Sequence, residues 1–133
     1  MNYTSSSNYY SLNIPDDWTI EEAEATISIY NEKDGFGVIN ITSYQIPENY
    51  FFRAHDELLE FVGGDINNEK LNLCKITDMD VASFEQIVQN TYWLYYIFYR
   101  KNKALFVTYN CNIDDMNNEK SLVDSIIGSL QIN

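Results

Sequence analysis

Basic side chains are scarce in this 133-residue sequence, which has eight Lys and Arg against twenty Asp and Glu and a formal net charge of −12. The first basic residue along the chain is Lys33. A protein that neutralises phosphate groups needs clustered Lys and Arg, so we expect neither a nucleic acid nor an anionic membrane surface as a partner. Half of the net charge lies in the first quarter of the chain, where the acids include Asp16, Asp17, Glu21, Glu22 and Glu24. This segment is either a solvated surface or a docking face for a basic partner.

Cysteine and histidine are scarce as well, with two cysteines and one histidine. Cys74 and Cys111 stand far apart and form no C-x-x-C pair, so the sequence offers no redox motif and no zinc knuckle. The single histidine, His55, stands beside Asp56, and any His-based catalysis would have to use this pair. A surface or structural histidine explains the same residues, and we expect no enzyme, no metal and no cofactor.

Oxygen-bearing side chains at residues 110–117 resemble a calcium-binding loop. The match fails because Asp115 stands where the loop needs glycine and Ser121 stands where it needs a bidentate glutamate. Capping of a helix after a strand explains these residues, so we expect no calcium site.

The sequence has no long hydrophobic run. The longest apolar and aromatic stretch, residues 93–99, is too short to cross a bilayer as a helix. The first residues have neither a positive region nor an apolar one of the kind that secretory signals contain. We therefore expect a cytoplasmic protein.

Hydrophobic residues make up 45% of the sequence and aromatic residues 15%, which indicates a folded chain in spite of the charge. With only two prolines and no repeat or linker, the sequence predicts a flexible N-terminus over residues 1–8 and one domain over residues 9–133. At this size a domain buries a core without needing disulfides or metal.

Periodicity predicts mostly strands. Alternation predicts strands over residues 9–14, 25–31 and 37–44, with Lys33-Asp34-Gly35 turning a hairpin between the last two. Helical spacing of Phe51, Leu58 and Val62 predicts a helix that ends at Gly63-Gly64. Two further strands, residues 84–90 and 92–100, precede a third over residues 104–111. A last helix places five residues on one apolar stripe: Leu122, Val123, Ile126, Ile127 and Leu130. The pattern indicates an α+β fold, with an antiparallel sheet of about six strands and helices packed on it.

The most unusual segment is residues 91–99, which is bulky on both faces if it is one strand. Trp93, Tyr95 and Tyr99 then share one face, and Tyr92, Leu94 and Phe98 share the other. Either helices and loops cover both faces, or the face with Trp93, Tyr95 and Tyr99 is open and anchors a partner. A second copy of the chain in a homodimer would satisfy the second alternative equally well.

Four segments together resemble the Mog1/PsbP-like domains found in many bacterial proteins of unknown function. They are Leu12-Asn13-Ile14-Pro15-Asp16-Asp17-Trp18, the pair of strands over residues 27–30 and 37–44, the strand over residues 105–111, and the closing helix that ends at Ser129-Leu130. The resemblance implies an antiparallel sheet between helices and a binding role, because relatives of this fold serve as accessory subunits, partners or chaperones. It implies no catalytic residue.

The sequence thus predicts a non-catalytic interaction module of the immunity-protein, chaperone or adaptor kind. Its acidic N-terminal segment would steer a basic partner, and Trp93, Tyr95 and Tyr99 would provide affinity. The alternative is a small-ligand-binding domain with an aromatic pocket between sheet and helix.

Overall fold

The computed structural model describes residues 1–62, 72–76 and 78–133, and for residues 72–76 it describes the strand but not the side chains. The predicted helix end at Gly63-Gly64 therefore lies outside the described residues. Among the helices described, none is long and apolar enough to cross a membrane.

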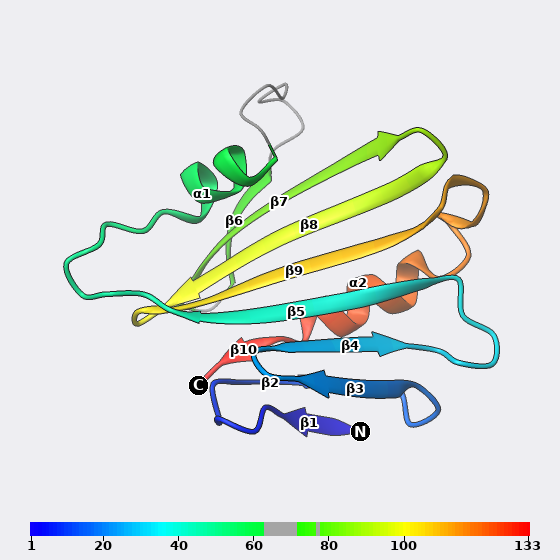
Figure 1. Cartoon of the computed structure of the whole chain (residues 1–133), viewed down its shortest axis with the longest axis horizontal. Helices are drawn as coiled ribbons and strands as arrows, with labels where there is room; N and C mark the ends of the chain where they lie inside the picture. Colours follow the sequence, from blue (N-terminus) through cyan, green and yellow to red (C-terminus); the bar gives the residue numbers. More distant parts are fainter. Residues whose placement is uncertain (63–71, 77) are drawn as a thin grey trace.

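A seven-stranded antiparallel sheet forms the centre of the molecule (Figure 1). Its spatial order is β3-β4-β5-β9-β8-β7-β6. These strands are β3 (Thr19–Ala23), β4 (Thr26–Tyr30), β5 (Gly37–Gln45), β9 (Lys103–Asn112), β8 (Thr91–Arg100), β7 (Met79–Val88) and β6 (Asn72–Ile76). The predicted hairpins β4–β5 and β8–β9 are confirmed, and so is the α+β class.

A smaller three-stranded sheet, which the sequence did not predict, joins the two ends of the chain. Strand β2 (Tyr10–Asn13) pairs with β1 (Asn2–Thr4) on one side and with β10 (Gln131–Ile132) on the other. Within the N-terminal segment 1–8, residues 2–4 form a strand, whose Tyr3 hydroxyl donates a hydrogen bond to the Glu22 carboxylate. The backbone pairing that holds this strand leaves no mark in the local hydrophobic pattern.

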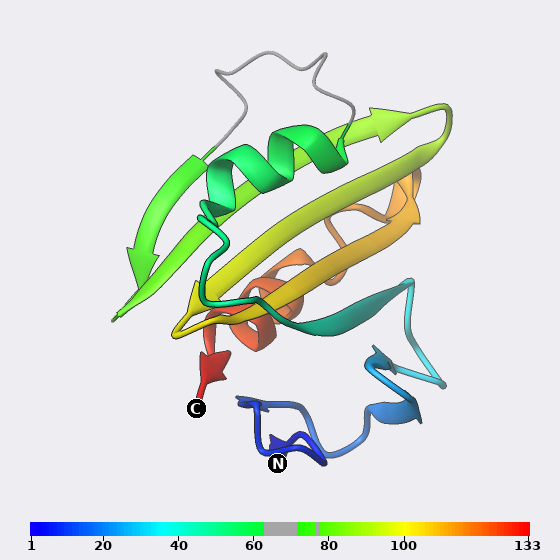
Figure 2. The same ribbon diagram turned by 60° about the vertical axis from the view of Figure 1, so that its left-hand side comes forward.

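The two α-helices in the described part of the chain lie on opposite sides of the large sheet (Figures 1 and 2). Helix α1 (Ala54–Phe61) packs on β7 and β8, and we name this side the front face. Helix α2 (Lys120–Gly128) covers the other side together with β2 and β10, and we name this side the back face. A short 3-10 helix, η2 (Ile113–Asp115), lies between β9 and α2 in the chain.

Helix α1 begins three residues later than the spacing of apolar side chains predicts, and Phe51 lies outside it with 78% of its surface exposed. The position where the helix begins has a long-range cause. The first helical N–H, that of Ala54, donates to Asp80 Oδ2 of β7 at 3.1 Å. An acceptor supplied from a distant strand satisfies a free N–H of the first turn, which local sequence does not reveal.

The closing helix is confirmed, but one member of its predicted stripe is wrong. Val123, Ile126 and Ile127 are buried and Leu130 follows them into the core, whereas Leu122 is 48% exposed. Leu122 lies one residue before Val123 and therefore at the edge of the apolar stripe, where it meets solvent.

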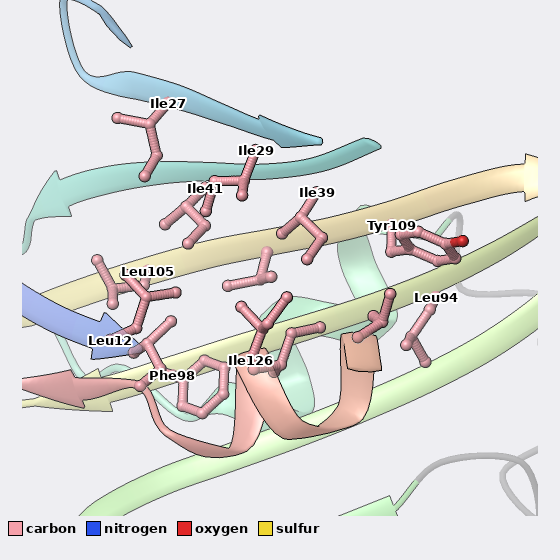
Figure 3. Close-up of a cluster of buried hydrophobic side chains, with 14 of the residues drawn as sticks. Leu12, Ile27, Ile29, Ile39, Ile41, Leu94, Phe98, Leu105, Tyr109 and Ile126 are labelled. Atoms are coloured by element: carbon pink, nitrogen blue, oxygen red, sulfur yellow. The ribbon is translucent and has the colours of Figure 1, made fainter. Parts of the chain in front are cut away.

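The main core fills the back face (Figure 3). Ile27, Ile29, Ile39 and Ile41 of β4 and β5 point into it and meet Leu12 and Ile126 from the covering layer. A smaller core lies under α1, where Ala54 and Leu58 pack on Ala82, Phe84 and Ile97.

Candidate functional site

A hollow of about 380 Å³ opens on the front face between α1 and strands β5 and β9. Its lining includes the buried residues Ile97 and Ala104 and the aromatic side chains of Tyr44, Phe52, Phe61 and Phe106. We name this hollow the front cleft. Its volume lies within the roughly 300–1,000 Å³ typical of small-molecule sites.

The depth of the front cleft comes from one small residue between two large ones. In the strand register, Ala104 of β9 lies opposite Tyr44 of β5 on one side and opposite Tyr99 of β8 on the other. Directly opposite side chains in an antiparallel pair are close neighbours. The methyl group of Ala104 therefore leaves a gap, which Tyr44 borders on one side and Phe52, stacked on Tyr99, borders on the other.

Ring contacts fix the walls of the front cleft. The Phe61 ring lies 4.0 Å from that of Phe106 and 5.8 Å from that of Tyr95, measured between centroids. The Phe52 ring stacks on Tyr99 at 4.5 Å. Such pairs add about 0.5–1.5 kcal/mol each beyond the area they bury. The walls are thus held in place, although no hydrogen bond joins these rings.

Large apolar side chains remain exposed around the front cleft. Tyr44 and Phe61 each keep about half of their surface exposed (50% and 53%), and Tyr50 and Phe51 extend the aromatic surface from the segment before α1. Exposed apolar surface gathered in one place is typical of a binding site. The signal in the sequence was the run Tyr50-Phe51-Phe52 just before a helix, because three consecutive aromatic residues cannot all face the core.

Among the described residues, the charged side chains that line the front cleft are both acidic. Glu57 and Glu60 lie one helical turn apart on α1. The Tyr50 hydroxyl donates to Glu57 Oε1 at 2.5 Å, and this bond raises the pKa of Tyr50. Glu60 is exposed. The last turn of α1 contains no basic residue, so the partial negative charge of the helix end is not neutralised within that turn.

The predicted aromatic anchors do share one face, as the alternation predicts. Tyr95 is only 8% exposed, because Phe61 covers it and Trp93 stacks on it at 5.8 Å. Tyr99 is half-buried under Phe52, and Trp93 is half-buried against the same small core. Strand β8 is therefore covered on both faces over most of its length, as the first of the two sequence interpretations holds.

All five predicted acidic residues, Asp16, Asp17, Glu21, Glu22 and Glu24, are exposed. They lie on edge strand β3 and the turns beside it, and Glu21 accepts a hydrogen bond from the Tyr30 hydroxyl at 2.6 Å. Strands β4, β5 and β9 separate β3 from β8. The register places Glu21 on the same face as Tyr95, but three strands lie between them, so the structure does not make the acids neighbours of Trp93, Tyr95 and Tyr99.

The remaining candidates stand apart from the front cleft. His55 Nδ1 lies 3.2 Å from Asp56 Oδ1 on the outer side of α1. The Cys111 thiol is buried, which raises its pKa, and the side chain of Cys74 lies outside the described residues. No group of three or more His, Cys, Asp or Glu that could hold a metal ion occurs in the described part of the chain.

Sequence reasoning missed a buried carboxylate at the start of α2. Glu119 is 4% exposed and accepts from Gly37 N at 2.8 Å, from Phe36 N at 3.3 Å and from the Tyr109 hydroxyl at 2.7 Å. Burial and the bond to Glu119 both raise the pKa of Tyr109. Glu119 therefore ties the β4–β5 loop and β9 to α2, which is a structural role. Its neighbours Asn118 and Lys120 give no local signal of it.

No protein-family model matches this sequence, and no curated protein does. Several solved structures are similar in fold. Cyanobacterial PsbP from Synechocystis sp. PCC 6803 matches with a TM-score of 0.72 and 13% identity over 100% of this chain and 92% of that one. A protein from Bacteroides thetaiotaomicron VPI-5482 matches with a TM-score of 0.65 and 19% identity over 99% of this chain. This chain spans about half of that protein, 48% of its length. The likeness confirms the predicted architecture, and the chain has a PsbP-like fold.

Proposed function

We propose that this protein is a non-catalytic binding module whose recognition site is the front cleft. The observation that carries the proposal is the open hollow of about 380 Å³ with half-exposed rings, Tyr44 and Phe61, at its rim. Leaving such rings in water costs free energy that burial against an apolar guest would recover, at roughly 25 cal/mol per Å². The site therefore favours a guest with an apolar or aromatic body.

The residue types around the front cleft support binding rather than catalysis. Its described lining contains no Ser, Cys, Lys or His, and of its two carboxylates Glu57 already accepts a hydrogen bond from the Tyr50 hydroxyl while Glu60 is exposed to solvent. The His55–Asp56 pair is not among the lining residues. The aromatic pocket between sheet and helix is the alternative that the sequence analysis raised, and the geometry favours it over an interface built on Trp93, Tyr95 and Tyr99.

Binding of small aromatic compounds tests the proposal. We would screen soluble fragments by thermal shift, since a ligand at 100 times its dissociation constant adds roughly 2.7 kcal/mol of stability. The variant Phe61→Ala should lose the hits, because it removes one wall of the front cleft. Ile87→Ala is the matched control, because Ile87 is equally exposed at 53% but lies on β7 away from the front cleft.

Hits that survive in Phe61→Ala, or that disappear equally in Ile87→Ala, would contradict the proposed site. A fragment set, charged and neutral, that yields no saturable binding would contradict it as well.

A second candidate function rests on a separate observation, the exposure of the five N-terminal acids. These residues could steer a basic protein partner, because electrostatic steering raises association rates in a salt-dependent way. Neutralising Asp16, Asp17, Glu21, Glu22 and Glu24 should then slow association and flatten its salt dependence. A control variant should remove as many exposed charges elsewhere, at Asp34, Glu48, Asp56, Asp78 and Asp114. Equal association by both variants would contradict this steering.

A further inference from the structure

The front cleft combines two features that attract the same kind of guest. Rings from three separate segments border it, with Tyr44 on β5, Phe106 on β9, and Phe52 and Phe61 from the α1 region. The face of an aromatic ring carries negative charge and attracts a cation within about 6 Å of the ring centre. Glu57 and Glu60 add two formal negative charges on one side.

Two basic side chains of the described residues near the front cleft, Arg53 and Lys103, point elsewhere. Arg53 lies over the Phe51 ring, with its guanidinium carbon 5.1 Å from the ring centre, and does not line the front cleft. Lys103 pairs in register with Gln45 of the lining, but its ammonium lies 5.1 Å from the Tyr9 ring centre and donates to Asn133 O at 2.9 Å. The negative charge at the front cleft is therefore not neutralised by these residues.

The two carboxylates would repel an anionic guest, and a neutral apolar guest would gain no electrostatic attraction from them. A compact ammonium on an apolar body would satisfy the rings and the carboxylates together. We propose that the front cleft binds an organic cation, namely an alkyl- or aryl-ammonium compound whose charge sits among the rings and faces Glu60. This inference rests on the proposed function and names the chemistry of its guest.

A pair of compounds of the same shape tests the charge directly. The para-hydroxyphenyl-trimethylammonium ion and para-tert-butylphenol differ in one atom, nitrogen against carbon, and in the charge that it brings. We would measure both dissociation constants by calorimetry on the wild type, on Glu60→Gln and on Glu48→Gln. Glu48 is the matched control, because it is an exposed glutamate just before α1 that does not line the front cleft.

The expected result is that the cation binds the wild type about tenfold more tightly than the neutral compound does. Glu60→Gln should weaken the cation about threefold to tenfold and leave the neutral compound unchanged, because only the charge is removed. Glu48→Gln should change neither. Raising the ionic strength should weaken only the cation.

Equal binding of the two compounds, or tighter binding of the neutral one, would overturn the inference and leave the proposed function standing. An equal effect of Glu60→Gln on both compounds would also overturn it, since that result indicates a change of shape rather than of charge. If neither compound bound and the fragment screen were also empty, both the inference and the proposed function would fall.

Discussion

The two faces of the large sheet are built from the same strands but differ in composition and in how far other elements cover them. On the back face, Ile29, Ile39 and Ile41 are fully buried under β2, β10 and α2. On the front face, β4 and β5 carry polar residues that form hydrogen bonds across the strands: Thr26 with Thr42 at 3.0 Å and Ser28 with Asn40 at 2.6 Å. Helix α1 covers β7 and β8 but leaves this polar half uncovered (Figure 2).

The back face contributes mainly to stability, whereas the front face has the open surface that recognition needs. Because successive side chains of a strand point to opposite faces, one strand can contribute to a closed core and to an open surface at the same time. The front cleft lies at the boundary on the open side, where the apolar residues under α1 meet the polar residues of β5. Its rings can therefore change without disturbing the main core.

The largest expected effect comes from opening the back face. Leu105→Ala should lower the free energy of unfolding by about 2–5 kcal/mol, because Leu105 is fully buried in the main core and truncation leaves a cavity. Thr108→Ala, at a half-buried position on the front side of the same strand, should stay within about 0.5 kcal/mol of the wild type. Urea denaturation of both variants measures the contrast. Similar losses in the two variants would contradict the assigned difference between the faces.

Removing the Glu119 carboxylate should have the next largest effect on stability. Glu119→Ala leaves two backbone donors and the Tyr109 hydroxyl without their acceptor, which should cost about 3 kcal/mol. Glu119→Gln should restore part of this loss, since an amide oxygen still accepts hydrogen bonds. Chemical denaturation measures both variants. Full stability of Glu119→Ala would show that the β4–β5 loop does not depend on this tie.

Alkaline pH should weaken the back face through Tyr10. Burial, with a contribution from the charge of Glu22, raises the pKa of Tyr10 to about 12. The unfolded chain releases this proton near pH 10, so the stability from Tyr10 is complete below about pH 10 and is lost as the pH rises toward 12. At about pH 11, Tyr10→Phe should therefore lose about 1 kcal/mol less than the wild type, relative to neutral pH. Parallel pH profiles for the two proteins would contradict this assignment.

The smallest expected effect tests the polar half of the front face. Ser28→Ala removes the hydrogen bond to Asn40 Oδ1 at a half-buried position and should cost about 0.5 kcal/mol. Thermal unfolding with replicate scans measures a difference of this size. If Ser28→Ala lowered the free energy of unfolding as much as Leu105→Ala does, the front face would contribute to stability as much as the main core.

The strands were predictable where one face is buried, because burial of alternate residues such as Ile27 and Ile29 imposes a period of two on the sequence. Helix α2 was predictable because its burial is also confined to one side, which places Val123, Ile126 and Ile127 at helical spacing in the sequence. The β2–β10 pairing was not, because it joins residues more than a hundred positions apart and leaves no mark on either local pattern. Likewise, the start of α1 depends on Asp80, and the role of Glu119 depends on the distant donors of Phe36 and Gly37.

The candidate site was predictable only in kind. An aromatic pocket between sheet and helix was anticipated, but its residues were not, because Tyr44, Phe61 and Ala104 become neighbours only after β5, α1 and β9 have packed. Tyr95 shows the opposite case, a residue that the sequence suggested for binding but that the fold buries. Its place in the most aromatic strand suggested an anchor for a partner, yet Phe61 covers it in the fold.

The most direct test of the account is to map amide chemical shifts while the para-hydroxyphenyl-trimethylammonium ion is titrated into the wild-type protein. The account predicts saturable shifts gathered at the front cleft, along α1 and the parts of β5 and β9 that contain Tyr44, Ala104 and Phe106. Shifts centred instead on α2 and β2, or on β3 and its neighbouring acids, would contradict the claim that the front face is the recognition face.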